Sequence, residues 1–198
     1  AFAALARAHA RAALPTRGDL YWLGEGFADT LAMHEPRHGL PYLSDVARLD
    51  WCVAGAEVAA DADFDAASLA RLEQDDPRVL TLALRPGTSL LASRHPVAAI
   101  RAAHAVDAPA TAFDAARAAL AADRGETVIV WRRGWRGAVA TLAGNEPRFT
   151  AALLAGDSLG AALDGAGAGF DFAAWLARAL QLGWLVAARP LAAVEARR

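Results

Sequence analysis

The sequence contains no lysine, a single cysteine and no long uncharged apolar run, and each shortage excludes a class of protein. All 20 basic residues are arginine, and 22 acidic residues leave a formal net charge of −2, which is not the charge balance of a typical DNA-binding protein. Cys52 alone excludes an internal disulfide, and its apolar neighbours favour a buried thiol. A membrane span needs about 18 apolar residues in a row. Neither such a run nor a signal peptide is present, so we expect a cytoplasmic protein.

The N-terminal part is rich in alanine and has the apolar spacing of helices. This spacing predicts helices over residues 2–14, about 25–33, 41–61 and 65–74. The second helix is expected to stop at Pro36 and Gly39, because proline disrupts a helix. We predict a helical domain over residues 1–76, closed by Asp76-Pro77. Ala1 stands in the middle of a helical pattern and is not methionine, so we expect an N-terminal part to be missing.

The remaining residues, 77–198, are predicted to form an α+β domain. Short apolar runs rich in β-branched residues predict two hairpins, residues 79–84 with 88–93 and residues 126–131 with 138–143. Residues 96–104 fit either a strand or a helix. Helices are further expected over residues 114–122, 146–154, 158–163 and 170–182. A hairpin followed by three helices predicts a winged-helix-like C-terminal half, so the fold class is α+β with a helical N-terminal half.

One segment, His34-Glu35-Pro36-Arg37-His38, matches the HExxH pattern of zinc enzymes. In that pattern two histidines one helical turn apart bind zinc, and the glutamate acts as a base. Pro36 lies between the two histidines and is expected to interrupt the helix. We therefore interpret the segment as a helix-ending loop and predict no metal.

A second segment, Gly156-Asp157-Ser158-Leu159-Gly160, resembles the serine motif of GDSL hydrolases. Those enzymes need a preceding strand and a later histidine base, whereas a helix is expected before this motif and the last histidine is His104. We interpret it as a helix junction, with Gly156 ending one helix and Asp157 or Ser158 capping the next. The glycine-alanine run at 165–169 is expected to be a loop, because no strand precedes it. No catalytic set assembles, so we expect no enzyme activity in this chain.

The second predicted hairpin carries arginines and large aromatic side chains around its turn. Both residue types are enriched in protein interfaces, and a hairpin edge can bind an extended peptide by strand addition. The alternative is a hairpin with one face on the core and solvated arginines at its tip. The candidate peptide- and partner-binding residues are Val128, Val130, Trp131, Arg132, Arg133, Trp135 and Arg136.

The segment LPYLSDVARLDW, residues 40–51, resembles the PYLxDLARLEW helix of a bacterial family of peptide-modification chaperones of the bufferin and methanobactin type. Members of this family are also described as DNA-binding proteins. Further matches follow in the same order at residues 86–94, 128–132 and 170–183. Val46 and Asp50 stand where the family has leucine and glutamate. The residues of this signature helix are Tyr42, Leu43, Asp45, Arg48, Leu49 and Trp51.

The resemblance implies a non-catalytic partner subunit of an iron-dependent TIM-barrel oxidase that modifies cysteines of a ribosomally made precursor peptide. Such a subunit is expected to bind the leader peptide and stabilise the heterodimer. The multinuclear iron is expected in the oxidase, with no cofactor in this chain. The predicted hairpin and three helices also resemble the winged-helix leader-recognition domains of peptide-modifying systems.

The winged-helix-like order leaves a DNA-binding transcriptional regulator as the alternative, with the arginine-rich hairpin as a wing. The expected recognition helix over residues 170–182 contains Arg178 as its only basic residue. Few side chains could then meet phosphates or guanines. We therefore expect peptide and protein partners, not nucleic acid.

Overall fold

The computed structural model describes residues 2–12 and 20–191 of the chain. In these ranges it is a mixed α+β protein with nine α-helices and two small antiparallel sheets, which confirms the α+β part of the predicted fold class. The helices are α1 Phe2–Ala12, α2 Phe27–His38, α3 Leu43–Val58, α4 Arg71–Gln74, α5 Val97–Ala103, α6 Ala112–Ala121, α7 Glu146–Leu154, α8 Leu159–Ala166 and α9 Phe172–Leu182. The strands are β1 Leu80–Leu84, β2 Ser89–Ser93, β3 Glu126–Arg133, β4 Arg136–Leu142 and β5 Leu185–Pro190. Short 3-10 helices are η1 Leu20–Gly24, η2 Ala67–Ala70 and η3 Pro77–Val79.

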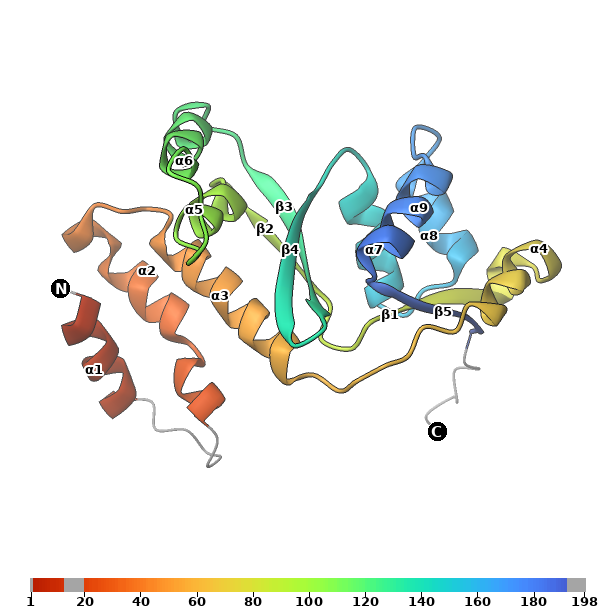
Figure 1. Ribbon diagram of the computed structural model, residues 1–198, viewed down its shortest axis with the longest axis horizontal. Helices are drawn as coiled ribbons and strands as arrows, with labels where there is room; N and C mark the ends of the chain where they lie inside the picture. The colour runs from red at the N-terminus through yellow and green to blue at the C-terminus, as the bar shows by residue number, and fades with distance from the viewer. Residues whose placement is uncertain (1, 13–19, 192–198) are drawn as a thin grey trace.

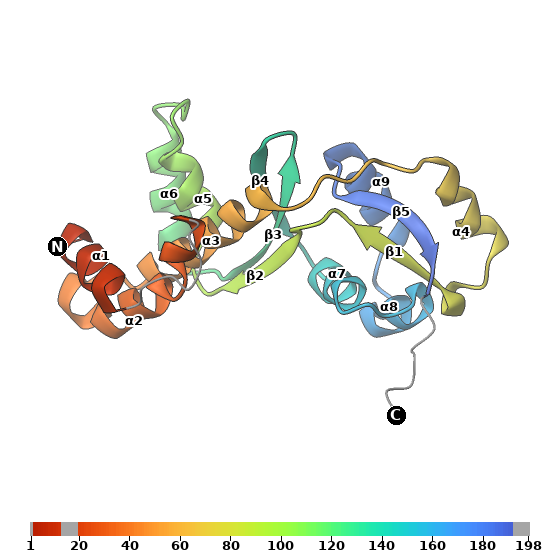
Figure 2. The same cartoon turned by 90° about the horizontal axis from the view of Figure 1, so that it is seen from below.

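The elements form two lobes along the long axis of the molecule (Figure 1). The first lobe contains α1–α3, α5, α6 and the three-stranded sheet, whose strand order is β2-β3-β4. The second contains α4, α7–α9 and the two-stranded sheet β1-β5. Figure 2 shows the chain leaving α3 for the second lobe and returning from β1 into β2. Segments from both sides of the expected boundary at residues 76 and 77 therefore lie together in each lobe.

The prediction that residues 79–84 and 88–93 form a hairpin with each other is wrong, although the turn between them exists. The N–H of Thr88 donates to the carbonyl of Arg85 at 3.0 Å, but β1 pairs with β5 and β2 pairs with β3. Gly87 has a φ of +76°, and a Cβ there would lie 2.5 Å from the Cβ of Ala59. The glycine turn therefore packs against the end of α3, and the two strands diverge into different sheets.

The second predicted hairpin is confirmed, because β3 and β4 pair in antiparallel register around the two-residue turn Gly134-Trp135. Gly134 has a φ of +63°, which a glycine adopts without strain at the first position of such a turn. The side chains of β3 alternate between two cores. Val128 and Val130 face the first core, whereas Ile129 and Trp131 face the second. The strand therefore forms a wall that both lobes share.

The first core is aliphatic and lies between the three-stranded sheet, α3 and α5. Leu49, Val53 and Ala56 of α3 meet Val97 of α5 there. A Cβ on Gly137 would lie 2.7 Å from Cγ1 of Val53 and 3.0 Å from its carbonyl oxygen. The missing side chain of Gly137 thus lets β4 lie directly on α3.

The second core is aromatic and lies among the sheets and α7–α9. Phe149 stacks on Phe170 with ring centroids 4.5 Å apart, and Trp131 meets Trp184 edge to face at 5.1 Å. The indole N–H of Trp175 donates to Oγ1 of Thr150 at 3.0 Å inside this core. The indole N–H groups of Trp131 and Trp175 are hydrogen-bonded, whereas that of Trp184 is buried without a partner among the described residues. The large rings therefore give this core its apolar contact, and the two hydrogen bonds fix the orientation of two of them.

The helix boundaries confirm several predictions and correct one. Helix α7 spans the predicted residues, and residues 97–103 of the ambiguous segment are helical. Helix α2 was expected to stop at Pro36, but its backbone continues to His38 and Gly39 follows with a φ of +65°. Pro36 falls in the last turn, where a missing amide hydrogen removes one bond near an end that frays easily. The predicted end of the first helix, beyond residue 12, lies outside the described residues.

Candidate functional site

The candidate binding residues of the β3–β4 hairpin separate into a buried base and an exposed tip. Val128 and Val130 are completely buried, and Trp131 is 2% exposed. The indole N–H of Trp131 donates to the carbonyl of Leu182 at 3.0 Å. These three side chains are interior to the fold, so they support the hairpin and present no surface to a partner.

Arg132 is also buried, although it is an arginine close to a surface turn. Its guanidinium donates to the carbonyl of Ala59 at 2.6 Å and pairs with Oδ1 of Asp61 at 3.0 Å. Its Nε–H donates to the carbonyl of Gly134 at 2.8 Å. Arg132 therefore ties the hairpin turn to the segment that follows α3, because one planar cation bridges both backbones.

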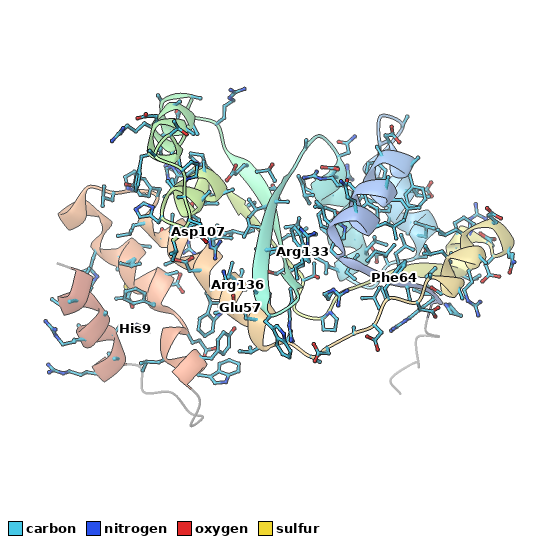
Figure 3. All side chains as sticks on the ribbon, viewed as in Figure 1. His9, Glu57, Phe64, Asp107, Arg133 and Arg136 are labelled. Carbon is cyan, nitrogen blue, oxygen red and sulfur yellow. The ribbon has the colours of Figure 1, made fainter. Side chains whose placement is uncertain are left out.

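The tip of the hairpin consists of Arg133, Gly134, Trp135 and Arg136, all of which are exposed. Trp135 is 83% exposed, and the guanidinium carbon of Arg132 lies 5.1 Å from the centre of its ring. Figure 3 labels Arg133 and Arg136 on the hairpin, with Glu57 close to Arg136. Of the seven candidate residues, the structure leaves Arg133, Trp135 and Arg136 accessible.

Strand β4 forms one edge of the three-stranded sheet, and side chains occupy both ends of that edge. The carboxylate of Glu57 accepts from the N–H of Gly137 at 2.9 Å. At the other end, Nη2 of Arg178 donates to the carbonyl of Thr141 at 2.6 Å, while its Nη1 bonds Glu146 at 2.9 Å. Val139 lies between them. In an antiparallel ladder, every second residue of a strand directs its N–H and carbonyl away from the partner strand, and Val139 is such a residue of β4.

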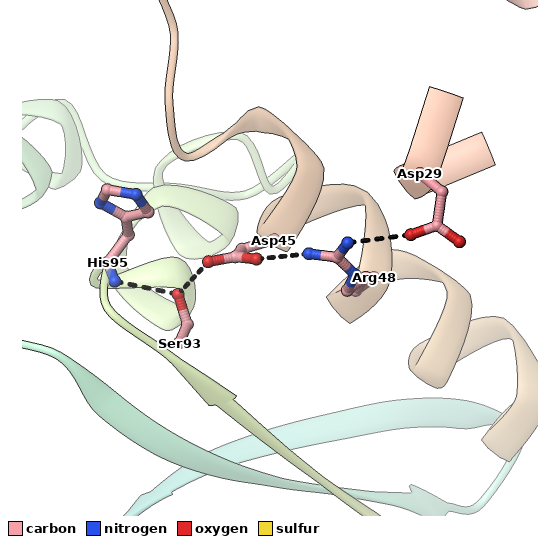
Figure 4. A network of polar contacts seen from close by, with 5 residues as sticks. All are labelled: Asp29, Asp45, Arg48, Ser93 and His95. Atoms are coloured by element: carbon pink, nitrogen blue, oxygen red, sulfur yellow. Dashed lines mark hydrogen bonds and ion pairs between the residues drawn. The ribbon is translucent and has the colours of Figure 1, made fainter. Parts of the chain in front are cut away.

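Residues 43–51 of the signature segment lie in the first part of α3, and their charged side chains connect three elements (Figure 4). Arg48 bonds Asp45 at 2.8 Å and Asp29 of α2 at 2.9 Å. The hydroxyl of Ser93, at the end of β2, donates to the second oxygen of Asp45 at 2.7 Å, and the N–H of His95 donates to that hydroxyl. The hydrogen bond that Arg48 donates to Asp29, and to a smaller extent the one that it donates to Asp45, raises the pKa of Arg48 above its ordinary value. These residues position α2, α3 and the sheet relative to one another.

The apolar residues of the signature helix are divided between the first core and two surface cavities. Leu49 is completely buried in the first core. Leu43 and Trp51 line a cavity of about 550 Å³ between α1, η1, α2 and α3, and Tyr21 stacks on Trp51 with ring centroids 4.1 Å apart. Leu43 and Tyr42 line a second cavity of about 500 Å³ on the side of α5. Sequence reasoning missed both cavities, because local apolar spacing predicts each helix but not how the helices pack against one another.

The larger cavity has mostly apolar walls with few polar groups. One ring nitrogen of His9 bonds Oγ1 of Thr30 at 2.8 Å and the other bonds the carbonyl of Glu25 at 2.9 Å. Burial, followed by the nearby Cys52 and Glu25, raises the pKa of Tyr21 above its ordinary value. The described walls therefore offer an apolar volume and no paired acid and base.

The two apparent enzyme motifs lie in ordinary structural positions. Nδ1 of His34 bonds the carbonyl of Thr30 at 2.8 Å, and the side chains of residues 35–38 lie outside the described part. Ser158 caps α8, because its Oγ accepts from the N–H of Ala161 at 3.1 Å, and Gly156 has a φ of +89°. The predicted helix junction is thus confirmed. Within the described ranges, no three His, Cys, Asp or Glu side chains are grouped as metal ligands would be.

Comparisons with known proteins identify no relative of this chain. No family model matches it, and no curated protein or solved structure shows significant similarity to it. Among the helices of residues 2–12 and 20–191, none combines the length and apolar character that a membrane crossing requires.

Proposed function

We propose that this chain is a non-catalytic subunit that binds an extended peptide and a protein partner through the β3–β4 hairpin. The observation that carries the proposal is the exposure of Trp135, at 83%, on a rigid base, while the other tryptophans are buried or half-buried. Arg132 beneath it is fixed by three bonds. An indole held in water by a rigid support is an anchor of the kind that dominates protein interfaces.

The outer edge of β4 supports the peptide-binding part of the proposal. An added strand would bond the outward N–H and carbonyl of Val139, between the positions that Glu57 and Arg178 occupy. Charged side chains commonly protect exposed strand edges, which limits unspecific pairing with strands of other chains. The two side chains therefore restrict the edge to a short peptide segment.

The identity of the peptide and the partner rests on the resemblance of residues 40–51 to the peptide-modification chaperones. By that resemblance the peptide is the leader of a ribosomally made precursor, and the partner is a TIM-barrel oxidase that carries the iron. The complex would act in the cytoplasm. The order of β3, β4 and α7–α9 is in keeping with a winged-helix-like leader-recognition module, and we propose that relationship as well.

The alternative of a DNA-binding regulator receives less support from the site. Arg178 is the only basic residue of α9, and its guanidinium is bonded to Glu146 and to the carbonyl of Thr141. The same guanidinium lies 5.7 Å from the ring centre of Trp184. A recognition helix whose single guanidinium is already bonded within the protein has few donors left to bind phosphates or guanines.

The test is co-expression with a TIM-barrel oxidase of the kind that the resemblance implies, followed by gel filtration and by anisotropy of the fluorescein-labelled leader peptide of that oxidase's precursor. We expect co-elution and saturable binding of the leader, both weakened about tenfold or more by Trp135→Ala, a typical loss for an interface anchor. Phe113→Ala is the matched control, because Phe113 is also an exposed aromatic residue but lies on α6. Separate elution together with no affinity for the leader would contradict the proposal.

A further inference from the structure

The arginine pair at the hairpin tip has an unusual arrangement of charge. Arg133 and Arg136 are directly opposite each other in the register, as the pair that closes the turn. Residues in such a pair present their side chains on the same face, with Cβ atoms about 5 Å apart. Neither side chain has a hydrogen bond or an ion pair to any residue in the described part of the chain. Two like charges directly opposite each other destabilise a hairpin.

Two acidic side chains near the hairpin, those of Glu57 and Asp61, form no hydrogen bond or ion pair with Arg133 or Arg136. The carboxylate of Glu57 accepts from the N–H of Gly137, and Asp61 is paired with Arg132. Figure 3 shows Glu57 beside Arg136 at the end of α3. The free protein thus keeps two positive charges together at an exposed turn, and an anion supplied from outside would relieve their repulsion.

The face on which the pair lies is also the face that the proposed peptide would follow. Alternation along β3 and β4 places Arg133 and Arg136 with Trp131 and Ala138, on the side of the second lobe. Arg132 lies on the opposite face, toward α3. A strand added to the outer edge of β4 would present every second side chain to the face of the arginine pair. One such side chain, beside Arg136, falls within reach of both guanidinium groups.

We infer that Arg133 and Arg136 recognise an aspartate or glutamate in the bound peptide segment. The inference rests on the proposed function and adds the chemistry of the ligand to it. A guanidinium group matches a carboxylate with two parallel hydrogen bonds, so two neighbouring arginines select an acidic side chain over a neutral amide of the same shape. Neutralisation of the pair contributes further, because the repulsion present in the free protein is relieved on binding.

The test uses three fluorescein-labelled peptides that are identical except for glutamate, glutamine or lysine at alternate positions. Binding to the full chain is measured by anisotropy at about 0.05 M and about 0.3 M salt, which changes the screening of exposed charges. We expect the glutamate peptide to bind about tenfold more tightly than the glutamine peptide at low salt, with a smaller ratio at high salt. The double variant Arg133→Gln/Arg136→Gln should lose this preference without a fall in Tm, because a repulsive pair is removed.

The matched control is Arg124→Gln/Arg148→Gln, which removes two other exposed arginines without partners in the described ranges and should keep the preference. The reversal Arg133→Glu/Arg136→Glu should favour the lysine peptide. Equal binding of the glutamate and glutamine peptides, or a preference that survives in Arg133→Gln/Arg136→Gln, overturns the inference. If binding remains sensitive to Trp135→Ala in that case, the proposed function stands and only the acidic selectivity fails. If no peptide binds, the inference fails, and the leader experiment decides the proposed function separately.

Discussion

The two faces of β3 are packed in different ways. On one face, Val128 and Val130 lie among aliphatic side chains, and Gly137 brings β4 against the backbone of α3. On the other face, Ile129 and Trp131 lie among aromatic rings. The first core depends on close fit between backbones, whereas the second depends on large rings, of which Trp131 and Trp175 are held by hydrogen bonds. One strand can therefore join two lobes, because each face is specified by a different kind of contact.

The largest loss of stability is expected from the aromatic face, in Trp175→Ala. Trp175 is completely buried and donates to Thr150, so its removal leaves a cavity and takes away a hydrogen bond. The free energy of unfolding should fall by about 3–5 kcal/mol in urea denaturation. Trp135→Ala is the control and should change it by less than about 0.5 kcal/mol. Similar losses in the two variants would contradict the division between buried and exposed rings.

A smaller loss is expected from the buried arginine between the hairpin and the segment after α3. Arg132→Met keeps much of the apolar stem but leaves the carbonyls of Ala59 and Gly134 without their donor. The free energy of unfolding should fall by about 1–3 kcal/mol, and amide exchange at the hairpin turn should accelerate. Arg133→Met should neither lower the free energy of unfolding nor accelerate amide exchange at the turn. Unchanged exchange in Arg132→Met would show that the tip is rigid for another reason.

Close fit on the aliphatic face is tested by Gly137→Ala. The added methyl group would meet both the side chain and the carbonyl of Val53, and backbone cannot move aside as a flexible side chain can. We expect a loss of about 1–2 kcal/mol in the free energy of unfolding. Gly165→Ala in α8 is the opposite control, because nothing lies within 4 Å of its added Cβ and a helix favours alanine, so it should gain about 0.5 kcal/mol. A neutral Gly137→Ala would mean that α3 and β4 can separate.

The smallest effect is expected at the junction before α8, where Ser158 acts as a cap. Ser158→Ala removes the acceptor for the N–H of Ala161 and should lower the free energy of unfolding by about 1 kcal/mol. Ser158→Asp keeps an acceptor and should retain stability near that of the wild type. Thermal unfolding followed by circular dichroism measures both variants. A loss of similar size in Ser158→Asp would show that the position matters for packing and not for capping.

Local signals in the sequence predicted elements better than they predicted pairing. The β3–β4 hairpin was predictable, because β-branched residues alternate on both sides of a glycine turn. The partner of β1 was not predictable, because β5 follows much later in the sequence, at Leu185–Pro190, and the local turn at Gly87 suggested β2 instead. The site divided in the same way. Arginine and tryptophan marked the hairpin tip, but Val128, Val130 and Trp131 belong to the interior, and only their neighbours in space show it.

By itself, the sequence determined where most helices and strands form, since turn residues, caps and apolar periodicity act over a few neighbouring positions. It also showed that Ser158 belongs to a helix junction. Only the tertiary structure decided that Arg132 is a buried link while Arg133, Trp135 and Arg136 stay exposed. Burial depends on which distant segments cover a side chain, and here the end of α3 and the segment after it cover one side of the hairpin and leave its tip in solvent.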